Sequence, residues 1–99
     1  AHTKKPHPTE ITPQSQIIKT ISAGTQFACL LTTTGVIYSF GENSHGELGV
    51  GDTIQRNHPV PITTFPKGQL ISQISCGTKH CIARTSIGRV YTWGWGENG

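Results

Sequence analysis

The chain has 99 residues and a formal net charge of +3, with 13% charged and 33% apolar residues. Its 14 Thr, 12 Gly, 11 Ile and 6 Pro favour strands joined by turns, and no apolar run reaches the roughly 18 residues that cross a bilayer. The composition therefore excludes a membrane-spanning protein, a helical bundle and a disordered tail, and the lack of a charged-then-apolar leader predicts no signal peptide.

Positive charge is concentrated at the N-terminus, where His2, Lys4, Lys5 and His7 lie among prolines. Such an arm can reach for phosphate or an acidic partner, but a solvated, extended stretch is the simpler interpretation. The other basic residues are scattered and lack the interleaved aromatics of a nucleic-acid surface. We therefore expect no direct contact with nucleic acid.

An internal repeat organises the chain. Residues 18–46 and 71–99 align without a gap at an offset of 53, and 10 of the 29 pairs are identical, among them Gly24/Gly77, Gly35/Gly88, Tyr38/Tyr91 and Gly41/Gly94. Residues 7–11 also echo residues 58–62 in part. Periods of 20–50 residues are typical of solenoids and propellers, and a period of about 50 lies at the propeller end.

Each copy opens with a strand in which apolar residues alternate with polar ones, around 17–23 in the first copy and 70–76 in the second. Gly24 and Gly77 follow these strands. We expect both to adopt a positive φ in a tight turn, because glycine lacks the Cβ that penalises this conformation.

The second strand is Phe27–Thr32 in the first copy and His80–Thr85 in the second. It is apolar on both faces or nearly so, which predicts burial within stacked sheets. Gly35 then lies at hairpin spacing between this strand and the next.

The third strand places Tyr38 and Phe40 on one face and Ile37 on the other. The second copy has Tyr91 and Trp93 at the matching aromatic positions. Large flat side chains fill the space between packed sheets well, so we predict that all four aromatics pack in a core.

The fourth strand follows a Gly-rich connection, Gly41–Gly51, and lies around Val60–Ile62, where Pro59 and Pro61 confine it to a sheet edge. Four short antiparallel strands make one propeller blade. The predicted fold class is therefore all-β, with β-propeller blades that form part of a ring. We expect three parts: the tail of a preceding repeat at 1–16, a complete repeat at 17–69, and the first three strands of the next repeat at 70–99.

Three cysteines are an odd number, which favours free thiols in a reducing, intracellular compartment. Cys29 and Cys81 lie within apolar runs, where cysteine behaves as a small hydrophobe. Cys76, His80 and Cys81 are spaced closely enough to suggest zinc, but structural zinc sites usually show two paired clusters of ligands. No second cluster follows, so we expect no metal and no cofactor.

The candidates for a partner-binding loop are Glu42, His45, Glu47, Asp52, Arg56 and Trp95, all in or near connections. Asp52 and Arg56 are four residues apart, and a local ion pair that shapes the loop is the preferred interpretation. Trp95 aligns with Glu42, which predicts partial exposure. No nucleophile elbow or triad spacing stands out, so we expect no catalytic residue and no enzymatic activity.

Two further motifs are Gly77–Cys81 followed by Gly88–Gly94, and Tyr38–Gly49 followed by Gly51-Asp52. Together they resemble the repeat of the regulator of chromosome condensation family, and the resemblance covers residues 5–99. Departures are local: Phe27 and Phe40 stand where His and Trp are more usual in that repeat.

The resemblance implies a seven-bladed β-propeller, of which these residues supply about two blades, so we expect a piece of a longer protein. It also implies a rigid ring whose loops grip another macromolecule. We therefore predict an intracellular protein–protein interaction scaffold, whose partner is a small GTPase or a large assembly. The alternative is guanine nucleotide exchange on a small GTPase. Photoreception is not expected, because Thr25 and Thr78 occupy the position where photoreceptor-like repeats carry Trp.

Overall fold

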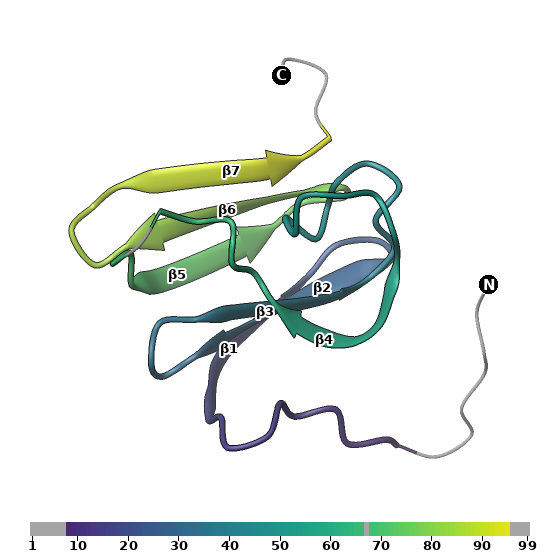
Figure 1. Cartoon of the computed structure of the whole chain (residues 1–99), viewed down its shortest axis with the longest axis horizontal. Helices are drawn as coiled ribbons and strands as arrows, with labels where there is room; N and C mark the ends of the chain where they lie inside the picture. The colour runs from purple at the N-terminus through teal and green to yellow at the C-terminus, as the bar shows by residue number, and fades with distance from the viewer. Residues whose placement is uncertain (1–7, 67, 96–99) are drawn as a thin grey trace.

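Seven strands and no helix make up the part of the chain that the computed structural model describes, residues 8–66 and 68–95 (Figure 1). The strands are β1 (Ile18–Ala23), β2 (Phe27–Thr32), β3 (Ile37–Gly41), β4 (Arg56–Pro61), β5 (Ile71–Cys76), β6 (His80–Thr85) and β7 (Val90–Gly94). The all-β class is confirmed, and these residues contain no helix able to span a membrane. The predicted basic arm, at residues 1–7, lies outside the described residues.

The strands form two antiparallel meanders, in the order β1-β2-β3-β4 and β5-β6-β7. β4 is an edge strand that contains Pro59 and Pro61, as predicted. It begins at Arg56 rather than near Val60, because the register between the two strands shifts after the Ser39–Val60 pair, so that Gly41 pairs with Arg56. The expected repeat boundary at residue 69 lies in the connection between β4 and β5.

The two sheets lie face to face, and the hydrophobic core fills the space between them (Figure 1). The connections close this core from the side, with Leu48 fully buried and Ile62 nearly so. From the sheets themselves, the buried core residues are Phe27, Cys29, Leu31 and Ile37 on the first and Ile71, Cys81 and Ala83 on the second.

Equivalent residues of the two copies differ in burial according to whether a sheet packs on them. Ile37 is 1% exposed, whereas its counterpart Val90 is 60% exposed on the far side of the second sheet. Ile21 is 65% exposed, whereas its counterpart Ile74 packs against the core. Each sheet therefore carries apolar residues for packing on both of its faces.

The two second strands show the same difference. In β2 five of six residues are buried, as predicted. In β6 only Cys81, Ala83 and Thr85 are buried, and Ile82 is 43% exposed. The prediction that β6 is buried on both faces is wrong here, because no sheet of the described residues covers its second face.

The aromatic residues of the third strands also follow this rule. Tyr91 and Trp93 of β7 pack against Phe65, with ring centroids 5.3 and 5.5 Å apart and edge-to-face geometry. Tyr38 and Phe40 of β3 lie on the face opposite Ile37 and are half-buried. Packing of the predicted kind is thus present for the second pair and partial for the first.

Gly24 and Gly77 do not adopt a positive φ, so the turn prediction for them is wrong. Their requirement is space: a Cβ on Gly24 would lie 2.1 Å from the Phe27 ring, and a Cβ on Gly77 would lie 2.3 Å from the His80 ring. The glycine and the ring three residues later therefore form one packing unit in each copy.

Positive φ is required at Gly41, which ends β3 with a φ of 111°. A Cβ there would also lie 2.5 Å from the Gln26 carbonyl oxygen. Gly46 has a φ of 74° and open space around it. Both glycines thus need a positive φ, but only Gly41 also lacks the space for a Cβ.

We expect Gly41→Ala to lower the free energy of unfolding by about 3 kcal/mol, through backbone strain and the carbonyl contact together. Gly46→Ala, the matched control, carries only the left-handed backbone penalty of about 1 kcal/mol. Denaturant unfolding of the full-length variants measures both values. Equal losses would show that the contact with Gln26 carries no energetic weight.

Candidate functional site

The connection between β3 and β4, residues 42–55, lies at the same end of the sheets as the β1–β2 and β5–β6 turns (Figure 1). The start of the connection is held there by the Glu42 amide, which donates to the Gln26 carbonyl at 2.8 Å. The equivalent bond of the second copy runs from the Trp95 amide to the Lys79 carbonyl at 2.9 Å. We call this end, made of residues 24–26, 42–55, 77–79 and Trp95, the loop face. It contains five of the six residues predicted to contact a partner, and the sixth, Arg56, begins β4 directly after it.

Asn43 organises the connection, although nothing in the sequence reasoning singled it out. Its side chain is fully buried. Its Nδ2 donates to the carbonyl oxygens of Asp52 (3.0 Å) and Ile54 (2.9 Å) and to Asp52 Oδ1 (3.1 Å). Its Oδ1 accepts a hydrogen bond from the Leu48 amide at 3.0 Å. One amide group thus joins the start, middle and end of the connection.

Asp52 and Arg56 form the ion pair that their spacing predicts, with Arg56 Nη2 2.9 Å from Asp52 Oδ2. The Arg56 guanidinium, followed by the Ile54 amide, lowers the pKa of the Asp52 carboxyl. The carboxylate also accepts a hydrogen bond from the Ile54 amide at 3.0 Å. These bonds all join residues between Asp52 and Arg56, so the arrangement fits the loop-shaping interpretation.

Glu47 is 1% exposed, in contrast to its predicted place in a contact surface. Its Oε1 accepts a hydrogen bond from the His45 amide at 2.7 Å. Its carbonyl oxygen accepts one from Trp93 Nε1 at 2.9 Å, across the space between the sheets. Glu47 therefore anchors the connection to β7 through its backbone, and its buried carboxylate lies against His45, with Oε2 3.7 Å from His45 Nδ1.

His45 and Trp95 form an exposed aromatic pair on the loop face. Their rings lie 5.6 Å apart, centroid to centroid, at an interplanar angle of 55°. Trp95 is 50% exposed, as its alignment with Glu42 predicts, and Glu42 is half-buried. The pair comes from connections that are 50 residues apart in the chain, so it exists only when the two sheets are packed.

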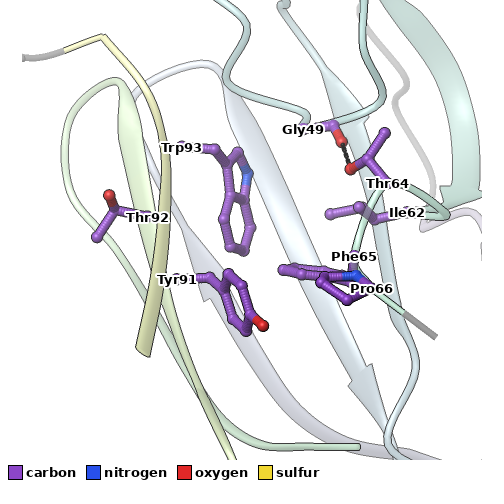
Figure 2. Close-up of a pocket in the computed structure, with 8 residues that line it drawn as sticks. All are labelled: Gly49, Ile62, Thr64, Phe65, Pro66, Tyr91, Thr92 and Trp93. Carbon is purple, nitrogen blue, oxygen red and sulfur yellow. Dashed lines mark hydrogen bonds between the residues drawn. The ribbon is translucent and has the colours of Figure 1, made fainter. Parts of the chain in front are cut away.

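A groove of about 200 Å³ opens between β7 and the linker that follows β4. Figure 2 shows the rings of Tyr91 and Trp93 turned toward Phe65, with Thr64 beside Gly49 on the Phe65 side of the groove. The Thr64 hydroxyl donates to the Gly49 carbonyl at 2.6 Å. The aromatic walls of the groove suit the binding of an apolar side chain better than a chemical reaction. Neither Phe65 nor this groove was predicted from the sequence.

The three cysteines are free, and the structure brings all of them together. Their sulfurs lie within 4.8 Å of one another. The close spacing of Cys76, His80 and Cys81 suggested zinc ligands, yet Cys29 takes the place of His80 in this cluster. Nothing in the spacing of the sequence placed Cys29 beside the other two.

Two stacked antiparallel meanders with a period of about 50 residues define blades of a β-propeller. Residues 34–84 match the family model of the regulator of chromosome condensation (RCC1) repeat, and residues 18–47 and 71–99 match a second model of that repeat. The chain belongs to the RCC1 repeat family.

Known proteins share this repeat. The chain is 38% identical over 94 residues to the ultraviolet-B receptor UVR8 of Arabidopsis thaliana, covering 95% of this chain and 21% of the receptor. It is 39% identical over 77 residues to Ras guanine nucleotide exchange factor C of Dictyostelium discoideum, covering 78% of this chain and 5% of that protein. The crystal structure of Prp20p from Saccharomyces cerevisiae, described with its binding to Gsp1p and histones, superposes with a TM-score of 0.73 and 24% identity. That likeness covers 87% of this chain and 22% of Prp20p, so the chain spans about a fifth or less of each protein.

We expect Asn43→Ala to lower the free energy of unfolding by about 3 kcal/mol, because it leaves the buried Leu48 amide without its acceptor and frees the end of the connection. Ser44→Ala is the control: Ser44 is exposed and its hydroxyl contacts only the neighbouring His45 ring at 3.1 Å. Its cost should stay within about 0.5 kcal/mol. Denaturant unfolding compares the two, and a small loss for Asn43→Ala would contradict its organising role.

Proposed function

We propose that these blades belong to a propeller that acts as an intracellular protein–protein interaction scaffold, and that the loop face contacts the partner. The observation that carries this proposal is the exposed His45–Trp95 pair. His45 lies on a connection whose inner residues are hydrogen bonded, and the Trp95 amide is bonded to the Lys79 carbonyl. Tryptophan is among the residues that contribute most to binding energy at protein interfaces. A contact residue held on a rigid support also loses little entropy on binding.

The residues of the connection have different roles, and this difference supports the proposal. Asn43 and Glu47 are buried and hold the backbone in place, while Asp52 and Arg56 bind each other. Of the six predicted contact residues, Glu42, His45 and Trp95 are then left to face a partner. This surface is small, so it would form one part of a contact made by several blades.

The partner we propose is another protein, with a small GTPase as the more specific candidate. Support comes from the names of similar proteins: Prp20p is described as binding Gsp1p and histones, and a second relative is a Ras guanine nucleotide exchange factor. Among the described loop-face residues, Glu42 is the acidic side chain not engaged within the connection. This favours binding over nucleotide exchange, which needs acidic and aromatic groups to displace the nucleotide. No enzymatic role is proposed for these residues.

The test of this proposal is a photo-crosslinking amino acid placed at position 95 of the full-length protein, with position 87 as the control. Ile87 is 72% exposed and lies in the β6–β7 turn, at the opposite end of the sheets. We expect a specific crosslinked protein from position 95 and none from position 87. Crosslinks from position 87 alone would contradict the assignment of the loop face.

Binding of that purified protein is then measured with single substitutions. Trp95→Ala should raise the dissociation constant about 30-fold, as expected for a loss of about 2 kcal/mol at a central contact. Ile87→Ala should change the dissociation constant by less than about twofold. If the partner is a small GTPase, release of a fluorescent guanine nucleotide distinguishes the alternatives. Unchanged release supports a scaffold, and accelerated release supports exchange.

A further inference from the structure

A pair of cysteines faces across one hairpin of the second blade. Cys76 ends β5 and Cys81 lies directly opposite it on β6. The next pair toward the turn is hydrogen bonded, with the Gly77 amide donating to the His80 carbonyl at 2.8 Å. Cys76 and Cys81 therefore occupy a non-hydrogen-bonded position, where facing side chains approach most closely. Their sulfurs lie 2.6 Å apart.

A third cysteine reaches this pair from the neighbouring blade. Cys29 of β2 places its sulfur 3.5 Å from Cys81 Sγ. Cys29 and Cys81 are fully buried, whereas Cys76 is partly exposed. The backbone of Cys76 is also bonded to the first blade, because its amide donates to Ser22 Oγ at 2.8 Å. Cys76 is thus the member of the cluster with exposed surface, while Cys29 and Cys81 are closed off from solvent.

Of the three thiols, the one with a lowered pKa belongs to Cys76, the partly exposed member of the cluster. The Cys29 and Cys81 thiols stabilise the Cys76 thiolate and lower the pKa of Cys76 to about 3. Hydrogen bonding to Cys76 raises the pKa of Cys29, and bonds to Cys29 and Cys76 raise that of Cys81. A partly exposed thiolate beside a buried thiol is the arrangement of redox-sensitive cysteines.

We propose that this cluster is an oxidation site for hydroperoxides, in which Cys76 is the reacting residue, Cys81 closes a disulfide with it, and Cys29 is a positioning residue supplied by the neighbouring blade. The spacing of facing strands at this position, about 4.5 Å between Cα atoms, lies within the range that disulfides span. Such a bond in a reducing compartment is transient and is reversed by thiol reductants.

The chemistry balances in two steps. The Cys76 thiolate attacks the terminal oxygen of the hydroperoxide, the O–O bond breaks, and the alkoxide leaves and takes a proton from water as the alcohol; Cys76 becomes a sulfenic acid. The Cys81 sulfur then attacks the Cys76 sulfur, the S–O bond breaks, and hydroxide leaves with the Cys81 proton as water. Two thiols are oxidised and one hydroperoxide is reduced, and no other reactant is needed.

A metal ion is the competing use of three sulfurs. Ligands at a zinc–sulfur distance of about 2.3 Å hold their sulfurs about 3.8 Å apart. The 2.6 Å separation of Cys76 and Cys81 is much shorter than this, and the facing strand positions of the two residues suit a disulfide. The geometry therefore favours the disulfide over a metal site.

The experiment treats the reduced full-length protein with one equivalent of tert-butyl hydroperoxide. Trypsin cuts after Lys79, which lies between the two cysteines, so a disulfide keeps the Cys76 and Cys81 peptides linked until a thiol reductant separates them. We expect this linked pair in the wild-type protein and its loss in Cys76→Ser. In Cys81→Ser we expect a sulfenic acid on Cys76 that dimedone captures.

Cys29 is tested by two variants. Cys29→Ala, which cannot donate to the thiolate, should raise the pH at which Cys76 ionises, because the loss of this donor raises the pKa of Cys76. The rate of Cys76 alkylation by iodoacetamide, measured as a function of pH, gives this shift. Cys29→Ser keeps a donor and should largely restore the wild-type pH profile, which a purely structural role would not explain. Matching circular dichroism spectra and unfolding midpoints establish that each variant is folded.

Three outcomes would overturn the proposal. One is that the folded protein, fully reduced beforehand, yields no linked peptides after treatment with the hydroperoxide. Another is a disulfide that joins Cys29 to Cys81 and leaves Cys76 reduced. The third is a stoichiometric thiophilic metal that co-purifies with the protein and protects all three sulfurs from the hydroperoxide.

Discussion

Burial of apolar side chains between two twisted sheets is the interaction on which the rest of the structure depends. Leu31 and Ile37 of the first sheet meet Ile71 and Ala83 of the second with almost no exposed surface. Each fully buried Leu or Ile contributes about 1.5–3 kcal/mol. A single meander cannot gain this, as the exposure of Val90 on the uncovered face of the second sheet shows. The blade is therefore a unit that is completed by its neighbours.

The position of the loop face follows from this packing. Trp93 lies between the sheets and donates to the Glu47 carbonyl, so the connection of the first blade is held by a side chain of the second. The Thr25 amide likewise donates to the Thr78 carbonyl at 3.1 Å, from turn to turn across the blades. The contact between His45 and Trp95 and the cysteine cluster both arise at this boundary, and neither exists within one repeat alone.

The sequence predicted the strands well because the repeat reveals them twice, and the edge position of β4 followed from Pro59 and Pro61. It failed where a requirement comes from tertiary contact. Gly24 looks like a turn glycine, but the Phe27 ring excludes its Cβ. Asn43 was missed because one amide that joins three backbone segments leaves no periodic signal. Cys29 and Cys81 meet through inter-blade packing that spacing alone does not encode.

The central claim is that the 42–55 connection is a rigid support for an exposed contact pair. Amide hydrogen exchange of the full-length protein tests it most directly, at the Leu48 and His45 amides, which are bonded to the side chains of Asn43 and Glu47. The account predicts that both amides exchange nearly as slowly as those of β2. Exchange at the rate of an unstructured peptide would show that the connection is mobile, and would contradict the account.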